Sequence, residues 1–431
     1  LTLFLCLGCS DPSTEPANTG GAGGSGGVGG SGGQSGGAGG SGGGAGQSGG
    51  GGQSGTSPDA SLFADVLAGK VDAAEGLTTI AQRGGLPIAT PEGYVFAHLD
   101  DGKGPYILEG DFNGWAAQSM QLESGVYWAS VVIGTPDGSK YKFVDGGSVH
   151  LADPLARRYG WDQFGEYSLV AASAPHRERF PQLGGEGRPP RTVRVWISSA
   201  APSHHLYVHD GQNLFDPDAI NGGWKLDETA GAKTLVIGID NIGAGRMDEY
   251  TPFPDDIGSG PVGGQGDAYA DYVEKVVRPA VESRYGVPQR VGVMGSSLGG
   301  LIALHQMQRH PGRYDFVASL SGTLGWGSIG PHTQTLIERF AANAKPGEKV
   351  YLDSGGGAGS GCVDSDADGV MDDAPNSSDN YCETVQLRDV LAGKGMSFDV
   401  ELWHWHEPGA PHNEVAWAGR VFRPLGIFEA L

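Results

Sequence analysis

The order of strands and helices in residues 175–431 constrains the fold more than any other feature of this sequence. Short β-branched and aromatic segments are expected to form strands: Thr192–Ile197, Leu206–His209, Thr234–Ile239, Arg290–Met294, Phe316–Leu320, Lys349–Asp353 and Phe398–Trp403. Helical patterns lie between them: Ala268–Tyr285 with a kink at Pro279, Leu298–Arg309, Thr333–Ala344 and Asn380–Lys394. Several strand segments are apolar at successive positions, as in strands covered on both faces. The alternation predicts a mostly parallel, doubly wound α/β sheet.

A Gly-x-Ser-x-Gly pattern joins one of these strands to the helix after it. Gly295 and Gly299 flank Ser297 at two residues on either side. Small residues there relieve the crowding of a sharp strand-to-helix turn and let the serine project from the edge of the sheet. The backbone N–H of Leu298, at the helix start, can stabilise a developing oxyanion. We therefore predict that Ser297 is a nucleophile.

A serine nucleophile needs a base, and in this fold the base follows the acid near the end of the chain. The candidates are His404, His406 and His412. His404 and His406 share one face of a strand-like segment, where packing in the sheet explains them. His412 lies in a Pro/Gly-rich loop just before a helix that starts at Asn413, and we predict that it is the base. A metal site built from the three histidines is the alternative.

Several segments in the expected order resemble the esterase D-like family, which includes enterochelin (ferric-siderophore) esterases and the feruloyl and acetyl-xylan esterases of carbohydrate esterase family 1. They are Tyr207–Asp216, Gly238–Asn241 with Arg246 and Glu249-Tyr250, the segment around Ser297, and His412–Glu414 with Trp417 and Arg420. The resemblance implies an α/β-hydrolase that cleaves carboxylic esters of siderophores or of feruloylated or acetylated polysaccharides. It also implies that the backbone of Gly211 or Gln212 supplies a second oxyanion donor.

The sequence departs from this family where the acid of a catalytic triad should lie. Relatives place Asp or Glu about three residues after the glycine that ends the penultimate strand, and counting from Gly355 reaches Ala358. Alanine cannot orient an imidazole. The acid is therefore left open among Asp364, Asp379, Glu407 and a Ser–His dyad without an acid.

An acidic insertion occupies this region instead. Asp residues at alternate positions followed by glycine offer converging carboxylates, which suit a hard cation. The segment resembles the calcium loops of EF-hands and thrombospondin type 3 repeats, and the second likeness is better because EF-hand position 12 would be Pro375. We predict a structural Ca²⁺ held by Asp364, Asp366, Asp368, Val370, Asp372 and Asp373. The alternative is a solvated acidic loop.

Cys362 and Cys382 bracket the insertion at 362–382. A disulfide between them would close a loop and contribute about 3 kcal/mol in the chain-entropy model. We predict this disulfide, which suits an oxidising compartment. Two free thiols are the alternative.

Residues 86–174 alternate short strand-like segments with Asp/Gly turns, which predicts a small antiparallel sandwich. The segment Gly110–Trp115, with Tyr141-Lys142-Phe143 downstream, resembles E-set domains related to glycogen-binding modules. That resemblance implies weak carbohydrate contact through Trp115 and Lys142. A second sugar-stacking Trp of that family is absent near Ser148, so a sandwich that only packs beside the catalytic domain is the alternative.

The N-terminal segment concerns location rather than chemistry. Of the 77 glycines, 23 lie between Gly20 and Gly55, so residues 10–60 form a disordered Gly/Ser-rich linker with nothing to bury. Residues 61–85 are a short, helical connecting segment. Residues 1–9 resemble the end of a bacterial lipoprotein signal with Cys9 as the lipidated residue, or else the remnant of an ordinary signal peptide.

The formal net charge of −22 disfavours nucleic-acid binding, because such a surface repels phosphate. After residue 10 there is no apolar segment of the roughly 20 residues that a membrane span requires. The sequence thus predicts an exported serine esterase at the cell envelope or surface, with no organic cofactor. The alternative is a catalytically inactive hydrolase fold that serves as a carbohydrate-binding surface module.

Overall fold

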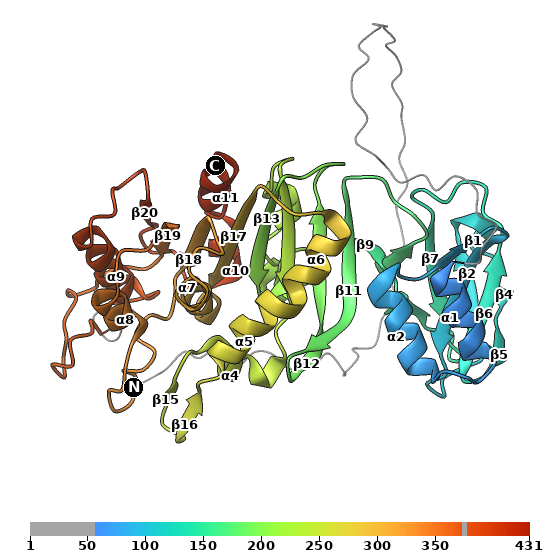
Figure 1. Ribbon diagram of the computed structural model, residues 1–431, viewed down its shortest axis with the longest axis horizontal. Helices are drawn as coiled ribbons and strands as arrows, with labels where there is room; N and C mark the ends of the chain where they lie inside the picture. Colours follow the sequence, from blue (N-terminus) through green and yellow to red (C-terminus); the bar gives the residue numbers. More distant parts are fainter. Residues whose placement is uncertain (1–56, 373–376) are drawn as a thin grey trace, which may run out of the picture. The chain divides into compact units, whose positions relative to one another are not determined.

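The computed structural model describes residues 57–372 and 377–431. Within them, the C-terminal strands pair side by side in the order β20-β19-β18-β17-β13-β14-β12-β11 (Figure 1). Their bounds are β11 His176–Gly185, β12 Arg188–Ile197, β13 His204–His209, β14 Thr234–Ile239, β17 Arg290–Ser296, β18 Phe316–Leu320, β19 Lys349–Ser354 and β20 Leu402–His406. Six neighbouring strands pair in parallel: β14, β13, β17, β18, β19 and β20. Strand β12 pairs antiparallel both with β14 and with β11.

Helices cover both faces of this sheet. One apolar core holds side chains from α5 (Gly266–Tyr272), α6 (Arg278–Tyr285), α7 (Leu298–Arg309), α8 (Leu336–Ala342) and α9 (Tyr381–Gly393). The other holds side chains from α3 (Leu226–Thr229), α10 (Glu414–Ala418) and α11 (Phe422–Glu429). Along β14, Leu235, Ile237 and Ile239 enter the first core and Val236 enters the second. Because side chains alternate along a strand, successive apolar residues fill both cores. The predicted α/β-hydrolase fold is confirmed.

The order of the parallel strands reverses between β13 and β17. Strand β14 lies on one side of β13, and β17 lies on the other. The loops that follow β13 and β17 therefore leave the same edge of the sheet as neighbours, at a place where open α/β sheets bind ligands.

Strand β11 was not predicted from the sequence, and several predicted elements have different bounds, of which the last strand and one helix are examples. The last strand is Leu402–His406 rather than Phe398–Trp403, because residues 397–401 form a turn closed by hydrogen bonds to the Ser397 carbonyl. The helix expected to kink at Pro279 is instead interrupted by the π-helical turn η5 (Val273–Val277), and Pro279 lies in the first turn of α6. Arg278 donates its backbone N–H to the Val273 carbonyl in a π-helical bond, so the wider turn just before Pro279 accommodates a residue that has no N–H to donate.

Two helices and a set of antiparallel strands precede this sheet. Helices α1 (Pro58–Leu67) and α2 (Ala73–Arg83) pack on the sheet β1-β2-β6-β5, and a second core lies on the other face of that sheet. The strands are β1 Ile88–Thr90, β2 Gly93–Leu99, β3 Ile107–Gly110, β4 Gln118–Ser119, β5 Gln121–Glu123, β6 Val126–Val131, β7 Lys140–Val144, β8 His150–Leu151, β9 Arg158–Asp162 and β10 Gly165–Leu169. The E-set assignment of residues 86–174 stays a prediction.

Strand β9 pairs with β11, so strands from both regions belong to one continuous sheet. At this junction Glu178 is buried and accepts hydrogen bonds from Arg284 and Tyr285 on α6. Among the described residues there is no helix with the length and apolar character needed to span a membrane.

Candidate active site

Ser297 lies on the sharp turn between β17 and α7, where the sequence places it. Its backbone has φ 56° and ψ −127°, a conformation that non-glycine residues rarely adopt. A side chain at Gly295 would collide with the backbone of Gly299, which explains the need for glycine at this position. The Ser297 Oγ lies 3.4 Å from Thr323 Oγ1, and Leu298, as the first residue of α7, has a backbone N–H without an intrahelical acceptor.

The second predicted oxyanion element follows β13. Gly211, Gln212 and Asn213 form a 3-10 turn after Asp210, whose backbone is left-handed with φ 60°. The buried Asp210 carboxylate accepts two hydrogen bonds of 2.8 Å from Arg246. Burial raises the pKa of Asp210, but the Arg246 guanidinium outweighs it and lowers the pKa below its usual range. An ionised, clamped Asp210 fixes the backbone that carries the predicted donors.

His412 lies in the loop between β20 and α10 and is hydrogen-bonded to a carboxylate. Its Nδ1 lies 2.6 Å from Asp379 Oδ1, and its ring meets the Trp417 ring edge-on with centroids 5.0 Å apart. The Asp379 side chain is 2% exposed, and its Oδ2 accepts hydrogen bonds from the Ser321 hydroxyl at 2.7 Å and from the Gly355 backbone N–H. Asp379 is therefore held on both carboxylate oxygens.

The other two acid candidates lie elsewhere. Asp364 accepts backbone N–H groups of Asp368 and Gly369 within its own loop. Glu407 is exposed and accepts the Trp405 indole N–H at 2.9 Å. Of the three carboxylates that the sequence left open, Asp379 is the one bonded to His412.

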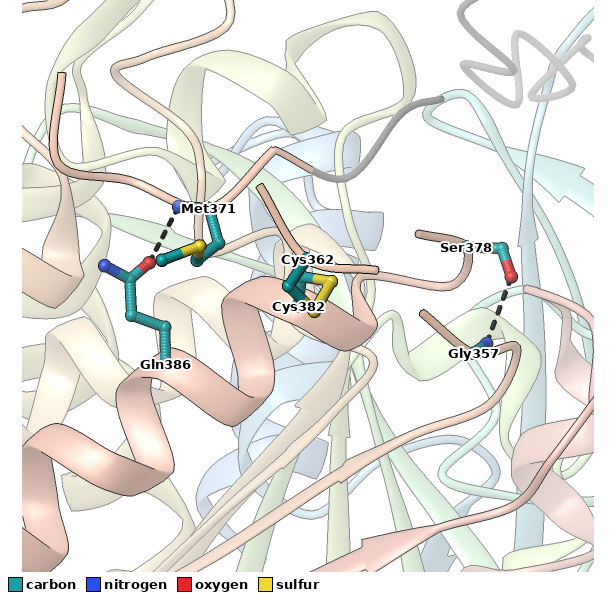
Figure 2. Close-up of a disulfide and its surroundings, with 6 residues drawn as sticks. All are labelled: Gly357, Cys362, Met371, Ser378, Cys382 and Gln386. Atoms are coloured by element: carbon teal, nitrogen blue, oxygen red, sulfur yellow. Dashed lines mark hydrogen bonds between the residues drawn. A yellow bond between two sulfur atoms is a disulfide. The ribbon is translucent and has the colours of Figure 1, made fainter. Parts of the chain in front are cut away.

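The path of the insertion explains how Asp379 comes to this position. The chain leaves the sheet after Gly355 and returns so that Ser378 donates its backbone N–H to the Gly357 carbonyl and accepts the Gly357 N–H on its hydroxyl at 3.2 Å (Figure 2). Asp379 thus lies beside Gly355 in space although it is 24 residues away in sequence. The bracketing cysteines were the one sequence signal that the two ends of the insertion meet.

Cys362 and Cys382 form the predicted disulfide, with Cα atoms 5.5 Å apart (Figure 2). Gln386 of α9 holds the same loop a second way, donating to the Gly369 carbonyl at 2.7 Å and accepting the Met371 N–H at 2.9 Å. The loop is therefore tied to the start of α9, the helix that directly follows Asp379.

The predicted metal ligands lie in this loop. Ligand oxygens of Asp364, Asp366 and Asp368 lie within 4.8 Å of one another, close enough to share one cation. Asp372 accepts the Ser365 N–H at 2.6 Å, and Val370 is buried. Asp373 lies outside the described residues. The donor set is all oxygen, as calcium prefers.

The remaining predicted residues do not join this site. His404 lies in β20, and burial lowers its pKa to about 4. His406 Nε2 is 2.9 Å from the Gly356 carbonyl, and within the described residues the three histidines do not gather into a group that could hold a metal ion. Trp115 is 39% exposed, but Lys142 is buried with its amine bonded to the Phe164 carbonyl at 2.6 Å. Sugar contact through these two residues stays a prediction. Cys9 lies outside the described residues.

Comparison with known proteins bears on this geometry. The family described as "Putative esterase" matches residues 189–418, which is more than half of the chain and includes Ser297, Asp379 and His412. The chain belongs to this esterase family.

Two curated relatives share sequence with this esterase. A siderophore triacetylfusarinine C esterase of Aspergillus fumigatus is 39% identical over 176 residues, 36% of this chain and 58% of the relative. The uncharacterized protein YbbA of Bacillus subtilis is 31% identical over 124 residues, 27% of this chain and 49% of the relative. The esterase chain thus spans only about half the length of these relatives.

Solved structures with a similar chain include two siderophore-cleaving enzymes. The enterobactin esterase of Shigella flexneri is 17% identical and aligns over 78% of this chain and 92% of its own, with a TM-score of 0.41. The siderophore hydrolase EstA of Aspergillus nidulans is 19% identical and aligns over 59% of this chain and 95% of its own, with a TM-score of 0.43.

Proposed function

We propose that this protein is a serine carboxylic-ester hydrolase that works through an acyl-enzyme. The hydrogen bond between His412 and Asp379 is the observation that carries the proposal. A neutral imidazole that donates its Nδ1 proton to Asp379 has its lone pair on Nε2, the nitrogen that must accept a proton. This pair and Ser297 are carried by loops that leave the same edge of the parallel sheet.

In the proposed reaction the Ser297 Oγ attacks the ester carbonyl while His412 Nε2 takes the serine proton. The backbone N–H groups of Leu298 and of Gly211 or Gln212 bind the oxyanion. His412 then gives the proton to the leaving alcohol, and the acyl group stays on Ser297. Water, deprotonated by His412, attacks the acyl-enzyme, and the carboxylic acid leaves as Ser297 regains its proton.

A siderophore ester is the substrate class we propose. The curated relative of Aspergillus fumigatus is, by its name, an esterase of a siderophore, and its 39% identity supports this choice. Feruloyl and acetyl polysaccharide esters are the competing class. A hydrolysis panel of catecholate or hydroxamate siderophore esters, feruloyl esters and acetyl-xylan tests it, and higher kcat/KM on either polysaccharide ester would overturn it.

The activity itself is tested by labelling with a serine-directed phosphonate. Wild type should gain one adduct on Ser297 and hydrolyse a short aryl ester. Ser297→Ala should lose both, whereas Ser199→Ala, at a half-buried serine that donates its hydroxyl to the Ala232 carbonyl, should keep both. A folded wild-type chain that takes up no label would instead fit a surface-binding module.

We also propose that a structural Ca²⁺ binds the loop at Asp364, Asp366 and Asp368, with Val370, Asp372 and Asp373 completing the ligand set. The close approach of three carboxylates supports the proposal, since a cation would relieve their repulsion. Calcium added after chelation should raise the Tm of wild type and leave that of Asp366→Asn unchanged. An equal Tm of wild type with and without calcium would contradict it.

We propose that the protein is exported and lipidated at Cys9, which would anchor it at the cell envelope or surface. A disulfide is typical of oxidising compartments, which supports export. Mass spectrometry of the mature protein from a host that lipidates lipoproteins should find acyl groups on Cys9, and none in Cys9→Ser. A mature N-terminus beyond Cys9 would rule the anchor out.

A further inference from the structure

The buried side of Asp379 contacts a network that the proposed reaction does not use. Arg420, between α10 and α11, has a side chain that is 2% exposed. Its Nε donates to Asp353 Oδ1 at 3.0 Å, and its Nη2 donates to the Ser321 hydroxyl at 2.6 Å and to Asp379 Oδ2 at 3.5 Å. The guanidinium thus lies between two buried carboxylates, one of which holds His412.

Ser321 has a hydroxyl whose orientation is fully determined by its neighbours. Its oxygen accepts the Arg420 Nη2–H and the Trp417 indole N–H, the latter at 3.1 Å. These two donors occupy both lone pairs, so the single hydroxyl proton must point to Asp379. Ser321 therefore links the position of Arg420 to the orientation of the Asp379 carboxylate.

Asp353 has no exposed side-chain surface at the end of β19. It accepts a hydrogen bond from the Tyr351 hydroxyl at 3.1 Å in addition to the one from Arg420. The pKa of Asp353 is raised to about 6, mainly by burial and to a smaller extent by the charge of Asp379, while Arg420 and the Tyr351 hydrogen bond oppose the rise. The carboxylate is thus a second anion behind Asp379 at neutral pH.

The charges in this network favour one state of His412. With a neutral imidazole, two buried carboxylates face one guanidinium, and one negative charge is left without a partner. Protonation of His412 neutralises the group. Because uncompensated charge is costly in a desolvated site, the network stabilises the imidazolium, the form that exists once Ser297 has given up its proton.

We propose that Asp353, Arg420 and Ser321 are positioning residues that act through Asp379 to hold His412 in the orientation and the charge environment in which it accepts the Ser297 proton. The inference rests on the proposed function. The titratable groups around this network are Tyr351 and Asp353 from β19, Asp379, His412 and Arg420. The guanidinium of Arg423 in α11 also acts on Tyr351, and His406 at the end of β20 is bonded to Gly356 beside the network.

The first test removes the charge of Asp353 and keeps its shape. In Asp353→Asn, the pKa of His412, followed by NMR of its Nδ1 proton, should fall by on the order of one unit. The acidic limb of the pH profile of kcat/KM should move by the same amount, and kcat should fall about tenfold with KM unchanged. Glu407→Gln removes an exposed carboxylate from the loop between β20 and α10. It should leave the pKa of His412, the pH profile of kcat/KM and kcat unchanged.

The second test keeps the charge of Arg420 and removes its geometry. Lysine is a point charge and cannot bridge Asp353 and Ser321 as the planar guanidinium does. Arg420→Lys should therefore keep the pKa of His412 near that of wild type but lower kcat.

An unchanged pKa of His412 in folded Asp353→Asn, or wild-type kcat in Arg420→Lys, would overturn the inference. Failure of the proposed function is a separate result. A wild-type chain that hydrolyses no ester would count against the esterase, while the NMR titration, which needs no turnover, would still decide whether Asp353 acts on His412.

Discussion

The hydrogen bond from His412 Nδ1 to Asp379 leaves Nε2 as the imidazole nitrogen that can accept a proton in the proposed mechanism. Asp379 is itself held by Ser321 and by the Gly355 backbone, so the carboxylate has little freedom to rotate. A carboxylate with both oxygens fixed can orient an imidazole with high precision. A substitution at Asp379 therefore tests the site most directly.

Asp379→Asn should fold but hydrolyse esters slowly. The amide can present its N–H to His412 Nδ1, which favours the tautomer with the proton on Nε2, where it cannot act as a base. In serine hydrolases that use a triad, this kind of change lowers kcat by about 10⁴-fold. Steady-state kinetics on a short aryl ester measures the loss, with Glu407→Gln as the matched control, and a loss smaller than tenfold would show that Asp379 is not the acid.

The disulfide-closed loop between Cys362 and Cys382 is connected directly to the part of the site that holds His412. The loop from Cys362 to Cys382 ends at the start of α9, and Asp379 lies three residues before Cys382. Closing this loop limits the positions that Asp379 can take relative to Gly355. The insertion thus moves the proposed acid, Asp379, away from the place in sequence where the family has it and fixes it in space beside Gly355.

Replacing both cysteines by serine should weaken stability and catalysis together. Opening a loop of this length should lower the free energy of unfolding by about 3 kcal/mol, because the unfolded chain regains freedom. The kcat should also fall, since Asp379 is no longer fixed from its C-terminal side. Urea unfolding and ester kinetics measure the two effects, and Cys362→Ser/Cys382→Ser with wild-type kcat would show that hydrogen bonds alone position Asp379.

A buried carboxylate stabilises the junction of β9, β11 and α6, where the N-terminal strands join the C-terminal sheet. Glu178 accepts hydrogen bonds from His176, Arg284 and Tyr285 and lies 3.3 Å from Arg158. Burial raises the pKa of Glu178, but hydrogen bonds from His176 and Arg284 outweigh it and hold the pKa well below its usual range. The ionised form is thus much more stable in the folded protein than in the unfolded chain.

The sign of this shift predicts acid sensitivity. A carboxylate with a lowered folded pKa stabilises the protein above its unfolded pKa of about 4.3, and this stability is lost as the pH falls further. Glu178→Gln should cost about 3 to 5 kcal/mol at pH 7, because Arg284 loses its partner in a buried site. The difference in the free energy of unfolding between wild type and Glu178→Gln should shrink below pH 4, and urea unfolding at pH 7 and at pH 3.5 measures it.

Glu123→Gln, at an exposed carboxylate in β5, should change neither the stability nor its pH dependence. A difference between wild type and Glu178→Gln that stays constant from pH 7 to pH 3.5 would mean that the ionised form of Glu178 does not support the junction.

Many strands, turns and loops of this protein could be predicted from the sequence, because local residue patterns encode them. Successive apolar residues predicted strands such as Thr234–Ile239, and the structure has a strand with these bounds. The turn at Ser297 and the loop position of His412 were likewise predicted, because glycine spacing and proline placement act over only a few residues. The disulfide was predicted from residue type, because Cys362 and Cys382 bracket the insertion and only cysteines form such a bond.

Tertiary structure alone decided which carboxylate meets His412. The local sequence does not show which of Asp364, Asp379 and Glu407 meets the imidazole, and only the path of the insertion back to Gly355 brings Asp379 there. The same holds for Arg420, whose two carboxylate partners come from segments 41 and 67 residues away. Local periodicity carries no information on such distant contacts, because they depend on how the whole chain packs.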